Sequence, residues 1–147
     1  MKSFDIGQMI SILANIGVIA GIAFLAFEIH QNNELLEAQA RFNHKETRAN
    51  LLGEFESNPE LARITVKAKK GEGVTAEEQL QLNAYNDKRF VSWEWEYYEA
   101  RAGRIEIPVA GYRSDMSDPV VRRRWDVRKL TLSPDFVRYI EENIIDR

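Results

Sequence analysis

The carboxylates and imidazoles of the chain come nearest to a reactive arrangement of side chains. Glu94, Glu96 and Glu99 alternate with aromatic residues in one segment, and the two histidines are His30 and His44. A bundle can hold a di-iron centre when its helices carry a glutamate three residues before a histidine. Neither histidine has a glutamate at that spacing. We therefore expect no metal ion and no other cofactor, and we expect these glutamates to lie on a solvated face or to form salt bridges.

Other catalytic signatures are missing from the sequence as well. The chain has no cysteine, which excludes disulfides, thiolate nucleophiles and cysteine-bound zinc. It contains neither the G-x-S-x-G motif of serine hydrolases nor the G-x-x-x-x-G-K loop that cradles phosphates. A net charge of −3 over 147 residues is too small to attract nucleic acid. The sequence predicts a non-enzymatic protein without a nucleic-acid partner.

Five basic residues cluster in one segment, namely Arg122, Arg123, Arg124, Arg128 and Lys129. On a membrane-tethered domain they would be able to contact anionic lipid headgroups or a partner protein. Consecutive helical residues point about 100° apart, so three adjacent arginines do not form one flat patch. We favour the alternative, in which these side chains pair with acidic residues of their own domain or of a neighbouring subunit.

An aromatic-rich segment is predicted to form the core of a helical bundle. At helical spacing its large side chains fall on two adjoining faces, Phe90, Trp93 and Tyr97 on one and Val91, Trp95 and Tyr98 on the other. So wide an apolar face is usually a buried face. A ligand pocket lined by these rings is the alternative.

The first third of the chain contains a long apolar segment. The run from Ile6 to Phe27 is free of charged residues over 22 positions, which corresponds to about 33 Å of helix and matches a hydrocarbon core of about 30 Å. We predict a transmembrane helix over about residues 6–28. The alternatives are a buried hairpin helix, an interfacial helix or a cleaved signal peptide. The last is disfavoured because its apolar region is usually about 7–15 residues long.

A small-residue motif lies inside this apolar segment. Gly17 and Gly21 form a GxxxG pair, which places two glycines on one helix face and lets a second helix approach closely. Ala14 extends the same face, and Asn15 offers a hydrogen bond between helices. We predict helix–helix contact in the membrane through these four residues.

Polar residues follow where the helix would leave the membrane. In a symmetric oligomer Glu28, His30 and Glu34 would surround the axis, and acidic rings at a pore mouth favour cations. The alternative is an ordinary polar boundary at the membrane surface. We favour that boundary, because the apolar segment offers almost no polar stripe to line a wet pore.

Capping and proline signals divide the remaining chain into helices. No stop signal precedes Asn58-Pro59, so the first helix is expected to continue to about residue 55. Thr75 and Glu78 form a capping box that opens a long helix. Arg104–Ile107 is the only strand candidate. The other expected helices cover about 59–70, a brief turn from 108, 119–130, and 134 onward.

These elements predict an all-α fold. A transmembrane helix continues into a long water-exposed helix and is followed by an antiparallel helical bundle. The expected division is a membrane anchor over residues 1–30 and a helical domain over residues 31–147.

Three segments carry a resemblance that extends over nearly the whole chain: "EIHQNNELLEAQARFN" after the apolar helix, "RFVSWEWEYYEARAG" at the centre and "LSPDFVRYIEENI". With these segments the chain resembles an uncharacterised bacterial family of short, membrane-anchored helical proteins. The resemblance implies a single-pass inner-membrane protein with a helical domain, and it implies no activity.

The leading functional hypothesis is assembly, either as a homo-oligomer or within a larger membrane complex. The alternatives are an oligomeric ion channel and a membrane-tethered ligand-binding or sensor domain. Arg41, Lys45 and Arg48 follow the apolar segment, whereas Lys2 alone precedes it. Because basic residues are retained on the cytoplasmic side, this asymmetry favours a cytoplasmic domain.

Overall fold

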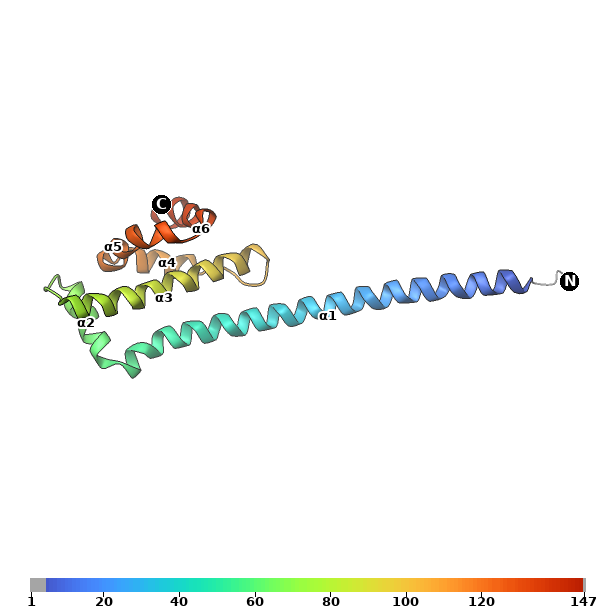
Figure 1. Cartoon of the computed structure of the whole chain (residues 1–147), viewed down its shortest axis with the longest axis horizontal. Helices are drawn as coiled ribbons and strands as arrows, with labels where there is room; N and C mark the ends of the chain where they lie inside the picture. The colour runs from blue at the N-terminus through green and yellow to red at the C-terminus, as the bar shows by residue number, and fades with distance from the viewer. Residues whose placement is uncertain (1–4, 147) are drawn as a thin grey trace. The chain divides into compact units, whose positions relative to one another are not determined.

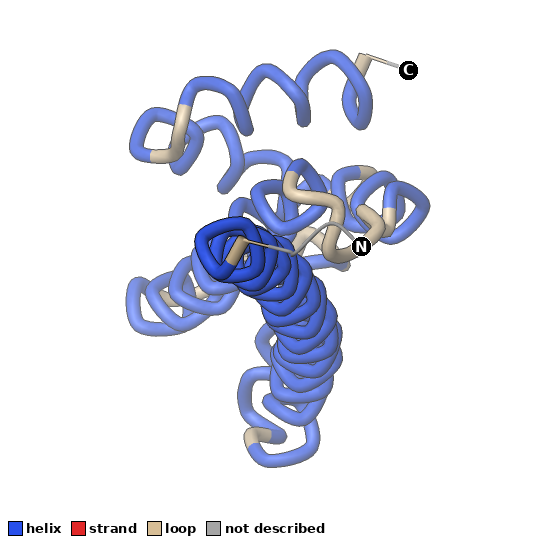
Figure 2. Tube along the Cα trace, turned by 90° about the vertical axis from the view of Figure 1, so that its right-hand side faces the viewer, coloured by secondary structure: helices blue, strands red, loops and turns tan. Residues whose placement is uncertain are grey.

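The chain folds entirely into helices in the part that the structure describes. The computed structural model describes residues 5–146, and within them Figure 2 shows helices and loops without a strand. This confirms the predicted all-α fold. The strand candidate Arg104–Ile107 is an irregular connection between two helices. That segment has no neighbouring strand with which to form ladder hydrogen bonds.

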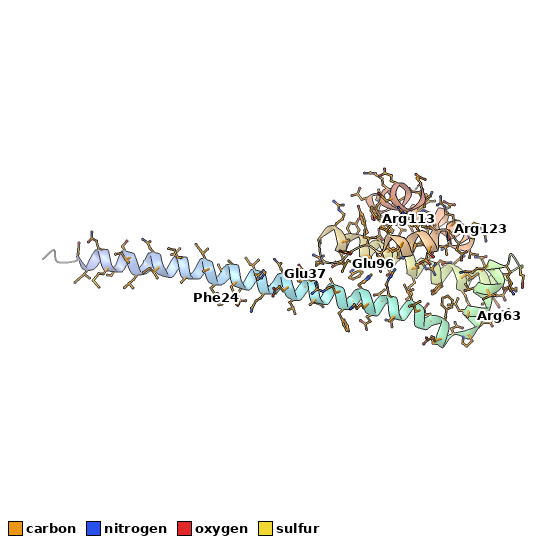
Figure 3. All side chains as sticks on the ribbon, turned by 180° about the vertical axis from the view of Figure 1, so that it is seen from behind. Phe24, Glu37, Arg63, Glu96, Arg113 and Arg123 are labelled. Carbon is orange, nitrogen blue, oxygen red and sulfur yellow. The ribbon has the colours of Figure 1, made fainter. Side chains whose placement is uncertain are left out.

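The first helix, α1 (Ile6–Ser57), is continuous through the apolar segment and beyond it, as predicted. It is long and apolar enough to cross a membrane by length and composition, and none of its most apolar window is buried. The side chains around Phe24 stand out from α1 on all sides (Figure 3). The chain divides into two compact units, one ending at Gln39 and one starting at Ala40. The last part of α1 therefore belongs to the second unit. The expected division into a membrane anchor over residues 1–30 and a helical domain over residues 31–147 stays a prediction.

The next two helices begin where the capping signals place them. In α2 (Pro59–Lys69) the Asn58 side chain accepts a hydrogen bond from the Leu61 amide, and proline occupies the first turn, where its missing N–H has no helical partner. In α3 (Ala76–Arg101) Thr75 and Glu78 form the complete capping box. Both orphan amide groups are thereby satisfied.

Three shorter helices complete the second unit. They are α4 (Val109–Met116), α5 (Pro119–Arg128) and α6 (Pro134–Ile140), with a 3-10 turn at Lys129–Thr131 and a π-helical turn at Glu141–Ile145. Asp118 caps α5 by accepting from the Val120 amide at 2.9 Å. Gly103 ends the turn after α3 with a φ of 75°, a left-handed conformation that glycine adopts without a Cβ clash. Figure 1 shows α3 running alongside α4 and α5.

The core of the second unit is aromatic. Trp93 on α3 stacks on Tyr112 of α4 with ring centroids 4.1 Å apart, and Trp125 of α5 meets Phe90 and Phe136 edge-on. These five side chains are at most 3% exposed. Such pairs contribute about 0.5–1.5 kcal/mol each beyond the apolar area that they bury. They hold α3, α4, α5 and α6 together.

The predicted core role of the aromatic segment is confirmed for one face only. Phe90, Trp93 and Tyr97 are buried, as expected. Val91 and Tyr98 are 48% and 44% exposed, so the prediction of a second buried face was wrong. The other helices cover a single side of α3, and a helix face opposite its neighbours stays in solvent.

Candidate functional site

A buried carboxylate is the most unusual feature of the second unit. Glu96 on α3 is 1% exposed, whereas the sequence predicted either a solvated face or a salt-bridge partner. The solvated face is wrong for Glu96: Tyr112 of α4 donates its hydroxyl hydrogen to it, and Arg48 in the last part of α1 forms an ion pair with it. Figure 3 labels Glu96 on α3. A buried charge is tolerated only where such partners replace water.

Two basic side chains of α1 approach the Glu96 carboxylate. His44 places Nδ1 3.1 Å from Oε1 of Glu96, and Arg48 places Nε 3.8 Å from the same oxygen. The His44 Nδ1 atom is buried and has no hydrogen-bond partner among the described residues. Burial, together with the neighbouring Glu96 charge, raises the pKa of Tyr112. Tyr112 therefore stays protonated and remains a hydrogen-bond donor.

A cavity of about 410 Å³ lies beside this carboxylate. It is lined by the last part of α1, by α2, α3 and α4, and by the start of α5. Its apolar lining is Leu51, Leu52, Phe55, Leu82, Tyr85, Trp93, Val120 and Val121. Its polar lining is Arg48, Thr65, Lys69, Asn86, Arg89, Ser92, Glu96, Ser114, Asp115 and Asp118. Small-molecule sites combine apolar walls with polar groups that fix the ligand's orientation, and this lining provides both.

Charges at the cavity wall are arranged as cation–carboxylate pairs. Lys69 contacts Asp118 at 2.9 Å, and Arg89 stands 3.8 Å from Asp115. Burial alone would raise the pKa of Asp118, but the hydrogen bonds from Lys69 and from the Val120 amide outweigh it and lower that pKa. The Arg89 guanidinium also lies over the Tyr85 ring, 5.1 Å from its centroid. The cavity therefore holds both signs of charge.

A cluster of ion pairs centred on Glu78 joins α2 to α3. Glu78 accepts hydrogen bonds from Arg63 and Lys67, each at 2.7 Å, and from the Thr75 amide at 2.8 Å. These donors favour the ionised form, so the pKa of Glu78 is lowered to about 2. The residue serves as both helix cap and ion-pair centre. It is structural, and it lies outside the cavity lining.

The basic side chains of α5 and of the turn after it lie in different environments. Arg124 forms a two-point contact with Asp87 of α3, at 2.7 and 2.6 Å, and Lys129 contacts Glu141 at 3.1 Å. Arg123 is exposed and Arg122 half-buried, while Nε of Arg128 is buried without a hydrogen-bond partner among the described residues. A contact of Arg122, Arg123, Arg124 and Arg128 with lipid or a partner stays a prediction.

The residues of α1 that are predicted to contact other membrane helices are exposed in this structure. Ala14, Asn15, Gly17 and Gly21 are all exposed, and a Cβ built on either glycine meets no atom within 4 Å. Further along, His30 places Nε2 3.3 Å from Glu34, one helical turn on, while both side chains stay about 70% exposed. Glu28 is exposed as well. Contacts between membrane helices and a pore mouth at these positions remain predictions.

No group of three or more acidic, histidine or cysteine side chains is placed to hold a metal ion within residues 5–146. No protein-family model matches the chain, and neither does a curated protein or a solved structure. The site is therefore defined by its own geometry. Sequence reasoning missed it because the cavity is lined by residues of five helices, whereas motifs are read along one.

Proposed function

We propose that the protein is a single-pass membrane protein in which α1 is the anchor and mediates assembly with further copies of the chain. The observation that supports this is the exposure of the apolar segment. Large apolar side chains from Ile6 to Ile29 are 50% to 74% exposed. A monomeric soluble protein rarely exposes a continuous apolar patch beyond a few hundred Å².

The energetic argument favours lipid around this segment. Each large apolar side chain gains about 1.5–3 kcal/mol when it leaves water. The helix satisfies its own backbone hydrogen bonds, which a segment in hydrocarbon must do. A core helix of a soluble protein would instead be mostly buried, and none of this window is.

Assembly would use the glycine face of α1. Association in lipid depends on close backbone packing, because lipid tails are as apolar as leucine side chains. The open space at Gly17 and Gly21 would admit a second backbone.

We also propose that the membrane is the bacterial inner membrane and that the second unit is cytoplasmic. Basic residues near the end of a spanning segment are retained in the cytoplasm. After the apolar segment, which ends at Phe27, the first lysine and arginine residues are Arg41, Lys45 and Arg48.

The experiment is a native mass measurement of the full chain, extracted together with its surrounding lipid. A discrete homo-oligomer is expected for the wild type, and Gly17→Leu with Gly21→Leu should shift it toward monomer. Ala26→Leu is the matched control, because it enlarges a small exposed residue on the opposite face of α1. A monomeric wild type would overturn self-assembly. Equal loss of the oligomer in both variants would remove the glycine face from the proposal.

A further inference from the structure

We propose that the cavity between α1, α2, α3, α4 and α5 binds a small monocarboxylate that carries an apolar body. This site goes beyond anchoring and assembly and does not depend on them, since all of its lining residues belong to the unit that starts at Ala40. Its volume of about 410 Å³ lies within the range of about 300–1,000 Å³ that small-molecule pockets occupy.

The apolar side chains that line the cavity favour a ligand with an apolar body. Leu51 and Phe55 of α1, Leu82 and Trp93 of α3, and Val121 of α5 all line the cavity. An aryl or short alkyl group would bury its surface against these side chains. A ligand made only of polar groups would leave this wall without contacts.

A buried hydroxyl at the cavity lacks a partner. Ser92 is 7% exposed and lines the cavity. Within residues 5–146 the Ser92 hydroxyl oxygen has no hydrogen-bond partner. Buried polar groups are nearly always paired in native structures. A ligand oxygen in the cavity would supply the missing partner.

Two guanidinium groups supply further donors. Arg48 and Arg89 each stand 3.8 Å from a carboxylate, Glu96 and Asp115 respectively, which exceeds hydrogen-bond distance. An arginine has five N–H donors in a planar fork that matches a carboxylate at two points. Stacking over Tyr85 holds Arg89 in place, and its side chain is only 14% exposed. These two guanidinium groups thus keep N–H donors available at the cavity, which favours a ligand that accepts hydrogen bonds.

The charges on the wall limit the ligand to one negative charge. Glu96 already accepts from Tyr112, so Arg48 is not its only partner and is available to a ligand. A dianion such as phosphate would meet Glu96, Asp115 and Asp118 at the same wall. A single carboxylate satisfies the guanidinium groups with less repulsion.

The test is isothermal titration of the full chain in lipid nanodiscs, with empty nanodiscs as the blank. The probes are 3-phenylpropionate, hexanoate and indole-3-acetate, and the matched controls are 3-phenylpropan-1-ol and acetate. We expect saturable binding of at least one of the three acids. The alcohol should bind about tenfold or more weakly, because it lacks the charge-assisted hydrogen bonds. No saturable heat with any of the acids at millimolar concentration would overturn the proposal, and so would equal binding of the alcohol.

Substitutions of cavity residues test whether the acid binds in this cavity. Arg48→Met and Arg89→Met should each weaken the acid about tenfold, whereas Arg123→Met removes an exposed charge outside the cavity and should leave binding unchanged. Ser92→Ala covers the case in which an arginine variant fails to fold, because it deletes a hydroxyl without a partner and should weaken binding while the fold is kept. Binding that survives Ser92→Ala and the folded arginine variants unchanged would place the acid elsewhere. Each of these readouts is independent of oligomeric mass, so failure here and failure of the assembly proposal are distinguishable.

Discussion

Tyr112 of α4 donates a hydrogen bond to Glu96 of α3 inside the aromatic core, where the two side chains are 0% and 1% exposed. Trp93 stacks on the Tyr112 ring and so fixes the direction of its hydroxyl. The pair places a charged acceptor next to a donor that stays protonated, because burial raises the pKa of Tyr112. One hydrogen bond thus connects the two helices and compensates a buried charge.

Tyr112→Phe should destabilise the second unit, because Glu96 keeps its burial and loses its hydroxyl donor. Hydrogen bonds to charged groups contribute about 1.5–3 kcal/mol, and we expect a loss of that size. Denaturant unfolding of the full chain in mild detergent, followed by tryptophan fluorescence, measures it. Tyr98→Phe is the matched control, since Tyr98 is 44% exposed. Equal effects of the two substitutions would contradict this role of the pair.

Glu78 should make stability depend on acid pH. Its pKa is lowered to about 2 from an ordinary 4.5, so the folded state favours the carboxylate. The stabilisation is present above about pH 4.5 and is lost as the pH falls from there toward 2. Glu78→Gln should therefore unfold more easily than wild type at pH 7, and the difference should shrink below pH 4.5. Glu77→Gln, in an exposed position of the same turn, should follow the wild type at every pH. A difference that stays constant with pH would contradict the ion-pair origin.

Most helix limits could be predicted from the sequence because they are set locally. Thr75 and Glu78 are three residues apart, and a capping box needs nothing further away in the chain. Asn58-Pro59 acts in the same way at the start of α2. The continuous α1 was also predictable, because the helical pattern persists and no proline occurs before Pro59.

The burial of Glu96 was not predicted because it depends on partners distant in sequence. Glu96 lies three residues after Trp93 and fourteen after Leu82, which puts it on the buried face of α3. That periodicity was a usable signal, but it favours an apolar residue at this position. A carboxylate is stable there because His44, Arg48 and Tyr112 surround it. These partners are distant from Glu96 in the sequence, so no local pattern predicts them.

The contact between Asp87 and Arg124 should be energetically coupled. Two parallel hydrogen bonds at 2.7 and 2.6 Å join them, and each side chain is about a quarter exposed. A double-mutant cycle with Asp87→Asn and Arg124→Met should give about 1 kcal/mol of coupling in denaturant unfolding. The comparison cycle uses Arg101 and Asp135, which stand 3.7 Å apart and are more than half exposed. Coupling there should be near zero because solvent screens the pair, and equal coupling in the two cycles would contradict the expected benefit of the two-point geometry.

The absence of cysteine makes the proposed topology testable with single reporters. Asp5→Cys lies just before α1, and Glu72→Cys lies in the exposed turn after α2. If α1 spans the membrane with a cytoplasmic second unit, a membrane-impermeant maleimide added to intact spheroplasts should label Asp5→Cys and leave Glu72→Cys unlabelled. Permeabilised spheroplasts should show labelling of both reporters, and the wild type provides the blank. The reversed pattern would place the second unit outside, against the distribution of Arg41 and Lys45. Labelling of neither reporter in intact spheroplasts, with both labelled after permeabilisation, would mean that α1 does not cross the membrane at all.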